Sequence, residues 1–312
     1  MENIDIIFDT DIGDDIDDAL AIGFALNCPE VNIKAITTVY GDTETRAKLA
    51  LKLLKTFHRE NIPVGIGIRK PILGKERMGP INQAIVLDEK EVSPAPSKYD
   101  AIDLIISQAM ACKNPVIVTV GPLTNLAAAL IKEPKIAKKA KLVMMGGAIN
   151  IQQAKIDYNI NCDPEAVRIV VDSGIKVIMV GVQVTTKCQL SQKELDNLAN
   201  KGLASTELLT NMIKAWQAYC WGQREVNPNI RKLYTNRKKI YPTLHDPLAL
   251  AVAFDQTLVK MEPRQIDVES RDKFIVATKN KPFNVQVCME VDTDRFIALF
   301  MKRILTDPLA NR

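Results

Sequence analysis

The chain has 312 residues, of which 47% are hydrophobic and 25% charged, with a formal net charge of +4. This is the ordinary composition of a globular protein, and it excludes a disordered chain, a collagen-like repeat and a disulfide-stabilised miniprotein. The small net charge is not gathered into a long basic block, so binding to nucleic acid or to a membrane surface is not expected.

The N-terminus and the cysteines indicate the compartment. The first residues carry no basic region followed by a long apolar run, so no signal peptide is expected. No apolar run approaches the roughly 20 residues that a membrane helix needs. The cysteines are scattered and form no Cys-x-x-Cys pair. We therefore expect reduced thiols in a cytoplasmic protein.

Short apolar runs alternate with longer helical patterns along the chain. A nearly continuous apolar run is typical of a strand buried on both faces of a parallel sheet. The expected strands are Asp5–Phe8, Asn32–Val39, Pro115–Val120, Lys141–Met145 and Lys176–Val180. The expected helices are Asp17–Leu26, Thr43–His58, Tyr99–Ala111, Asn125–Ile131 and Pro164–Val171. This alternation predicts an α/β fold with an open, doubly wound, mostly parallel sheet and a Rossmann-like core.

The second half of the chain departs from this alternation. Residues 190–240 are polar and largely helical, with a helix expected over Leu203–Trp221 and a basic run over Arg231–Lys239. No Gly/Ser/Pro-rich linker separates this stretch, so we interpret it as a helical insertion that covers a cleft near the active site, within a single domain of residues 1–312. The tail alternates over Asn284–Val291 and then becomes helical over Asp292–Leu305.

The densest group of acidic side chains directly follows the first expected strand. Six aspartates fall within ten positions: Asp9, Asp11, Asp14, Asp15, Asp17 and Asp18. Carboxylates this close repel one another, and a hard divalent cation such as Ca²⁺ or Mg²⁺ would relieve the conflict. Ligands bind at the carboxyl ends of strands in open α/β sheets. Capping of the next helix remains the alternative role for Asp17 and Asp18.

Further polar segments also follow strands or begin helices. His245 and Asp246 precede Pro247 at the start of an apolar helix, a place where a titratable proton donor is useful. Val118–Asn125 ends a strand in a Gly-Pro turn whose carbonyls are free to bind a metal. Met144–Asn150 and Asp157–Glu165 are rich in Asn and Asp, which suit sugar hydroxyls.

Taken together, these motifs resemble the inosine–uridine-preferring nucleoside hydrolase family, which cleaves the N-glycosidic bond of ribonucleosides. The resemblance runs from Ile4 to about Leu305. Its motifs are Asp-Asp-Ala-x-Ala after the Asp-x-Asp, Thr-Val-Tyr-Gly-Asp, Val-Gly-Pro-Leu-Thr-Asn, Met-Gly-Gly, Tyr-Asn-x-x-x-Asp-Pro-Glu-Ala and His-Asp-Pro.

The resemblance implies a role for each matching residue. A Ca²⁺ ion would be bound by Asp11, Asp18, Asp246 and the backbone carbonyl of Val120. Asp11 would also be the general base for the attacking water, and His245 the acid that protonates the departing base. The ribose pocket would be formed by Asp17, Asp42, Met145, Asn150, Asp157 and Asn159. The family also implies a ribonucleoside as the partner and a homodimer or homotetramer.

The first motif is two residues longer than its common form, because Asp14, Asp15 and Ile16 stand between Gly13 and Asp17. Either Asp15 or Asp17 therefore meets the ribose. The longer loop, together with Cys162 and Cys188, looks like a cysteine-bearing bacterial subgroup. The base preferred stays open, with Trp216, Tyr219, Trp221 and Tyr234 of the insertion as candidates for stacking.

Two other functions fit parts of this pattern. A Mg²⁺-dependent phosphatase of the haloacid-dehalogenase type would use Asp9 as its nucleophile, but it leaves His245 and Asn159 unexplained. A non-catalytic nucleoside- or calcium-binding protein on the same fold would not need both Asp11 and His245.

Overall fold

The computed structural model describes residues 3–75, 79–87, 100–149, 157–226, 240–270, 273–277 and 285–310. Within these ranges the chain forms a sheet with strand order β3-β2-β1-β4-β5-β6-β9-β7-β8. The strands from β3 to β9 in this order are parallel, whereas β7 runs antiparallel to β9 and β8 antiparallel to β7. The strands are β1 (Ile4–Thr10), β2 (Val31–Thr38), β3 (Val64–Ile66), β4 (Val116–Thr119), β5 (Lys141–Met145), β6 (Lys176–Val180), β7 (Val259–Ser270), β8 (Lys273–Ala277) and β9 (Val285–Val291).

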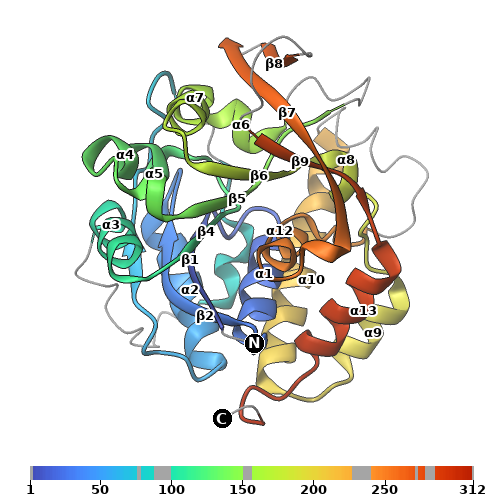
Figure 1. The fold of residues 1–312 in the computed structure, drawn as a ribbon. Helices are drawn as coiled ribbons and strands as arrows, with labels where there is room; N and C mark the ends of the chain where they lie inside the picture. Colours follow the sequence, from blue (N-terminus) through green and yellow to red (C-terminus); the bar gives the residue numbers. More distant parts are fainter. Residues whose placement is uncertain are drawn as a thin grey trace.

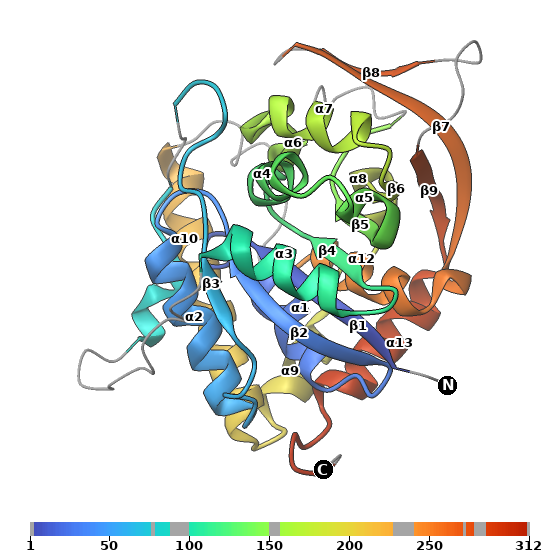
Figure 2. The ribbon, with the colours of Figure 1, turned by 60° about the vertical axis from the view of Figure 1, so that its left-hand side comes forward.

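Helices cover both faces of this sheet (Figures 1 and 2). One face packs against α3 (Ala101–Ala111), α4 (Thr124–Lys132), α5 (Ile136–Lys139) and α7 (Pro164–Asp172). The other packs against α1 (Asp17–Leu26), α2 (Thr43–Thr56), α9 (Gln192–Ala199), α10 (Ala204–Val226), α12 (His245–Phe254) and α13 (Thr293–Ile304). Each face has its own large hydrophobic cluster, so the predicted doubly wound α/β fold is confirmed. Short α6 (Tyr158–Cys162), α8 (Val182–Thr185), η1 (Asn82–Val86) and η2 (Gln256–Leu258) complete the elements.

The apolar runs form the central strands for the expected reason. All four residues of β4 are buried, as are the last five of β1, because helices lie on both sides of them. Aspartates cap several of the helices that follow, among them Asp100 at α3 and Asp163 at α7. Pro164 takes the first position of α7, where it loses no hydrogen bond. The expected helix starting at Tyr99 begins at Ala101, and Tyr99 lies outside the described residues.

Strands β7 and β8 were not predicted. Charged side chains alternate along the first half of β7, at Lys260, Glu262 and Arg264, and this half pairs antiparallel with β9. Such a strand lies near the edge of a sheet, where one face meets water, so it lacks the apolar run that marked the central strands. The short β3 was missed for its length alone.

The described part of the helical insertion is built into the fold. Helix α10 packs against α1, α2 and η1, and its residues Leu209 and Met212 belong to the main hydrophobic cluster. Helix α10 is therefore a layer of the core, and the expectation that the insertion covers a cleft stays a prediction. The predicted basic run over Arg231–Lys239 lies outside the described residues. No helix among the described residues is long and apolar enough to span a membrane.

Candidate active site

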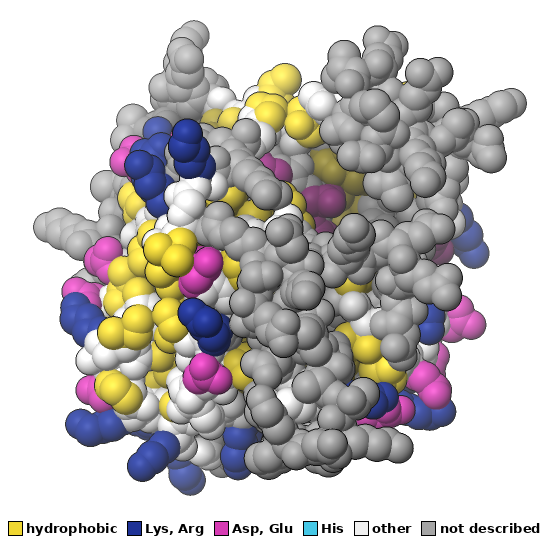
Figure 3. All heavy atoms as spheres, turned by 90° about the horizontal axis from the view of Figure 1, so that it is seen from above, with side chains coloured by type: hydrophobic (Ala, Val, Ile, Leu, Met, Phe, Trp, Pro, Cys, Tyr) yellow, Lys and Arg dark blue, Asp and Glu magenta, His cyan; other side chains and the backbone are white. Residues whose placement is uncertain are grey.

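The predicted site residues converge at one edge of the sheet. Strands β1, β4 and β5 are parallel neighbours, so their carboxyl ends at Thr10, Thr119 and Met145 lie side by side. Helix α12 packs against both α1 and β5, which brings its first residues to the same edge. In the space-filling view from above, acidic side chains lie at the bottom of a recess (Figure 3).

Three buried carboxylates from two helices form the centre of the site. Asp17 and Asp18 begin α1, Asp246 lies in the first turn of α12, and one ligand oxygen from each lies within 4.8 Å of the others. This arrangement of hard oxygen ligands fits a divalent cation. The predicted ligands Asp18 and Asp246 are thus brought together, and Asp17, predicted for the ribose, lies beside them.

Asp11 follows the end of β1 and interacts electrostatically with Asp17, Asp18 and Asp246, although it is not one of the three whose oxygens lie within 4.8 Å of one another. A Cβ atom built on Gly121 would lie 2.9 Å from the Asp11 carboxylate, so the carboxylate fills the space beside the Val120–Gly121 backbone. A side chain at position 121 would press on the Asp11 carboxylate and on Val39. The predicted ligands Asp11 and Val120 are therefore neighbours.

The electrostatics of the cluster call for a positive charge. Burial is the largest cause that raises the pKa of Asp11, Asp17 and Asp246 well above 3.8, and repulsion by neighbouring aspartates raises it further. Burial also raises the pKa of Asp18 to about 7, against the hydrogen bond that Thr10 donates to it. Such shifts mean that ionised carboxylates are unstable here without a counter-charge. The residues present therefore fit a bound metal ion.

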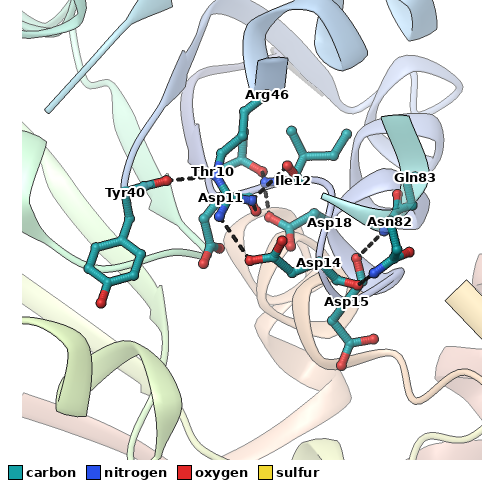
Figure 4. A network of polar contacts seen from close by, with 10 residues as sticks. All are labelled: Thr10, Asp11, Ile12, Asp14, Asp15, Asp18, Tyr40, Arg46, Asn82 and Gln83. Atoms are coloured by element: carbon teal, nitrogen blue, oxygen red, sulfur yellow. Dashed lines mark hydrogen bonds and ion pairs between the residues drawn. The ribbon is translucent and has the colours of Figure 1, made fainter. Parts of the chain in front are cut away.

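Arg46 supplies one positive charge from the opposite side of the loop (Figure 4). Its guanidinium donates to the backbone carbonyls of Asp11, Ile12 (2.8 Å) and Tyr40 (2.7 Å), and to the Asp14 carboxylate (2.9 Å). These bonds fix the backbone that carries Asp11. Sequence reasoning missed Arg46, although it is a charged residue on the apolar side of a predicted amphipathic helix, in line with Leu49, Ala50 and Leu53.

The two extra residues of the first motif are held by η1. The Asn82 amide donates to the carbonyl of Asp14 (2.6 Å) and the Gln83 amide to that of Asp15 (2.5 Å). The side chain of Asp15 is exposed, whereas that of Asp17 is buried. Asp17, and not Asp15, therefore lies in the carboxylate cluster.

The remaining predicted pocket residues lie around the ends of β4 and β5. The Asn159 amide donates to the carbonyl of Val120 (2.6 Å) and to that of Met145 (3.3 Å). Asp157 is buried, caps α6 by accepting from the Ile160 N–H, and has a pKa raised to about 6 by burial. Asn150 lies outside the described residues.

Asp42 and Asp9 are engaged in structural contacts. Asp42 caps α2 and accepts hydrogen bonds from the backbone N–H and the hydroxyl of Thr45. Asp9 is fully buried and accepts from Thr37 (2.5 Å) and Asn125 (2.8 Å). Because Asp9 is 0% exposed, a substrate phosphate cannot reach it, which argues against the nucleophile of a phosphatase of the haloacid-dehalogenase type.

His245 begins α12, directly before Asp246. Its ring is partly buried, and burial lowers its pKa from 6.5 to about 4, so the ring is neutral near pH 7. Nδ1 lies 2.6 Å from the hydroxyl oxygen of Thr185, a residue that sequence reasoning did not single out. Nothing in the sequence marks Thr185, because the pairing joins segments 60 residues apart.

Comparison with known proteins identifies this arrangement. Residues 6–298 match the family described as inosine-uridine preferring nucleoside hydrolase. The chain is 30% identical to the pyrimidine-specific ribonucleoside hydrolase RihA of Salmonella paratyphi A, over 96% of this chain and 97% of the relative. It is 31% identical to the protein of the same name from Salmonella arizonae, with the same coverage.

Solved structures agree with the sequence relatives. The purine-preferring ribonucleoside hydrolase of Gardnerella vaginalis superposes with a TM-score of 0.82 at 32% identity, covering 96% of this chain and 98% of that one. A plant nucleoside hydrolase superposes with a TM-score of 0.83 at 27% identity, covering 98% and 100%. The chain therefore belongs to the inosine-uridine preferring nucleoside hydrolase family and hydrolyses the N-glycosidic bond of ribonucleosides.

Proposed function

We propose that the enzyme is calcium-dependent, with one Ca²⁺ held by Asp11, Asp18, Asp246 and the carbonyl of Val120. The observation that carries this proposal is the cluster of buried carboxylates at the start of α1 and α12. Their hard, charged oxygens suit Ca²⁺, which accepts six to eight oxygen ligands and flexible geometry. When bound, the ion would orient the attacking water and the ribose hydroxyls.

The ribose is held by the residues that surround the cluster. Asp17 lies beside Asp18 and Asp246 and is buried, so we assign the ribose contact to Asp17 and leave Asp15 at the exposed rim. Asn159 donates to the carbonyls of Val120 and Met145, after β4 and at the end of β5, and the Asp157 carboxylate lies beside Gly146. Ribose contacts by Asn150 and Asp42 stay predictions. The observed hydrogen bonds of Asp42 are those of a helix cap.

Two residues carry the chemistry in this proposal. Asp11 accepts a proton from the water that attacks the ribosyl carbon, and the C–N electron pair leaves with the base. The neighbouring carboxylates stabilise the positive charge that builds on the ribosyl ring. His245 is the acid group: its ring, neutral near pH 7, donates an N–H to the departing base and stabilises the negative charge that builds there.

Among the aromatic candidates for the base contact, we favour Tyr219. Trp216 is 4% exposed and packs in the main hydrophobic cluster, which indicates a core residue. Trp221 lines a separate groove of about 350 Å³ between α9 and α10. The Tyr219 hydroxyl lies near Gly79, and its pKa is raised by burial and by the charge of Asp14, which places it on the side of the acidic loop. Tyr234 lies outside the described residues.

The relatives differ in the base that their names give. The curated relatives are named as pyrimidine-specific, whereas the Gardnerella enzyme is named as purine-preferring. If Tyr219 stacks on the base, Tyr219→Ala should raise KM for the preferred nucleoside while Trp221→Ala leaves it unchanged. A similar KM for both variants would show that Tyr219 does not stack on the base.

We also propose that residues 1–312 form one domain, that the protein acts in the cytoplasm, and that it assembles as a homodimer or homotetramer. Strands from both ends of the chain, β1 and β9, lie in one sheet. All six cysteines are free and buried, as suits a reducing compartment. Light scattering on the purified protein tests the assembly.

Metal analysis tests the calcium assignment. After extensive dialysis, the protein should retain calcium at close to one ion per chain. A metal-free protein with full activity that a chelator leaves unchanged would contradict the proposal.

A further inference from the structure

The contact between Thr185 and His245 is fixed by the backbone on both sides. The segment after α8 and the segment before α12 are joined by hydrogen bonds from the Leu244 N–H to the Cys188 carbonyl (2.7 Å) and from the Leu190 N–H to the Pro242 carbonyl (3.0 Å). A β-bridge between Gln189 and Thr243 lies between them. The threonine hydroxyl is therefore held at the ring and does not meet it by chance.

The position of the hydroxyl proton follows from its surroundings. Thr185 is fully buried, so its O–H must donate to a protein acceptor. Among the described residues, Nδ1 of His245 is the one hydrogen-bond partner that the structure gives this hydroxyl. A ring nitrogen that accepts a hydrogen bond carries no proton of its own, so in the neutral ring the proton is on Nε2.

The neighbouring Thr186 makes the hydroxyl contact that is usual for a threonine in a helix. Thr186 is exposed and donates its hydroxyl to the Val182 carbonyl (2.7 Å), one turn earlier in the same segment. This bond to the preceding turn is the usual contact of a helical threonine. The hydroxyl of Thr185 is instead directed to the histidine.

We propose that Thr185 is a positioning residue for catalysis: its hydroxyl holds His245 in the orientation and tautomer that present an Nε2–H to the departing base. The proposal rests on the proposed role of His245. A neutral imidazole that donates a hydrogen bond can stabilise negative charge on a substrate atom. The opposite tautomer would direct its N–H to Thr185 and a lone pair to the base, which would oppose departure of a base that is becoming negative.

The tautomer can be measured directly, whatever the activity. The chain has two histidines, so the variant His58→Asn leaves His245 as the only imidazole. Asparagine suits this position because His58 has a positive φ of 56°. In ¹⁵N-labelled protein near neutral pH, we expect a protonated Nε2 and an unprotonated Nδ1. A ring protonated at Nδ1 overturns the proposal even if the enzyme cleaves nucleosides.

Kinetics test the consequence for the reaction. Thr185→Val removes the hydroxyl, Thr185→Ser keeps it, and Thr186→Val is the matched control that removes a neighbouring hydroxyl. With the preferred nucleoside, we expect Thr185→Val to lower kcat by about tenfold or more, within the range that proton-transfer groups contribute. Thr185→Ser should recover most of the rate. With p-nitrophenyl riboside, whose leaving group needs no donor, all three should stay near the parent rate.

Other outcomes separate the alternatives. Equal losses on both substrates, or no loss on either, overturn the proposal and leave Thr185 a structural role. In a His245→Ala background, Thr185→Val should cost nothing more, because the two residues act as one unit. An additive loss overturns the proposal as well. If the parent enzyme releases no ribose from any nucleoside, the proposed function fails while the tautomer still tests the placement of His245.

Discussion

The guanidinium group of Arg46 lies 2.9 Å from the Asp14 carboxylate, and only 3% of the arginine side chain is exposed. The same guanidinium binds the carbonyls of Asp11 and Ile12, so one buried cation holds the backbone of the acidic loop in place. The carboxylates of Asp17 and Asp18, by contrast, lie beside that of Asp246 in α12. Arg46 is thus a fixed positive charge on one side of the loop. The group of Asp17, Asp18 and Asp246 is where a bound cation would lie.

Replacing Arg46 should strongly destabilise the protein. Arg46→Met leaves buried carbonyls and a largely buried Asp14 without their partner, and loss of one member of a buried ion pair costs about 3–5 kcal/mol. Arg295→Met, which breaks the exposed pair with Asp255, should cost less than about 1 kcal/mol. Urea unfolding measures both. Equal losses for the two variants would show that Arg46 does not organise the loop.

Asp18→Asn should weaken calcium binding by about tenfold or more, because it removes one anionic ligand and keeps the shape of the side chain. Asp103→Asn, at an exposed ion pair with Lys132, is the control and should bind calcium like the parent. Isothermal calorimetry on chelated protein gives both affinities. An unchanged affinity for Asp18→Asn would remove this residue from the metal site.

The chelated protein should lose stability as pH rises. Asp18 ionises near 3.8 when unfolded but at a pKa of about 7 when folded without a cation, and the pKa of Asp11, Asp17 and Asp246 is also raised. A carboxyl with a raised folded pKa contributes stability below about pH 4, and this contribution is lost as pH rises through about 7. We expect the Tm of chelated protein to fall over this range and calcium to cancel the fall. The same slope with and without calcium would contradict the assignment.

Asp11→Ala should leave the fold intact and lower kcat by about 10²–10⁴, the usual contribution of a general base. The fold survives because removing one buried carboxylate also relieves repulsion from Asp18. Circular dichroism checks the fold, and ribose release gives kcat. A fall of less than threefold would exclude Asp11 as the base.

His245→Ala should separate substrates by their leaving groups. Hydrolysis of a natural nucleoside should fall by about 10² or more, because a purine or pyrimidine anion is a poor leaving group. Cleavage of p-nitrophenyl riboside should stay close to the parent rate. If both slow together, His245 instead positions Asp246, and the proton comes from another group.

Local sequence was enough to predict the central fold. The strands β5 and β6 and the helix α1 have the bounds that their patterns indicated, because an apolar run reports burial and aspartates in the first turn mark the start of a helix. Strand β7 was not predictable in this way, since its charged residues are compatible with many exposed structures. Its place depends on pairing with β9, which lies later in the chain.

In the site, too, local motifs were predictable and contacts between distant segments were not. The aspartates and His245 were found because they cluster in short motifs. The partners that hold them were missed, since Arg46, Thr185, Asn82 and Gln83 reach the site only through contacts between distant segments. Each is unremarkable where it stands in the sequence. Which of Asp15 and Asp17 is buried also needed the structure, because it depends on the path of the longer loop.

In the proposed mechanism, the carboxylate cluster binds calcium and the same site hydrolyses ribonucleosides. Ribose release from inosine, adenosine, guanosine, uridine and cytidine, measured on native, chelated and recalcified protein, tests it most directly. We predict release from at least one nucleoside, a fall of about 10² or more after chelation, and recovery with calcium. Release that chelation does not change, or no release from any nucleoside, would contradict the account.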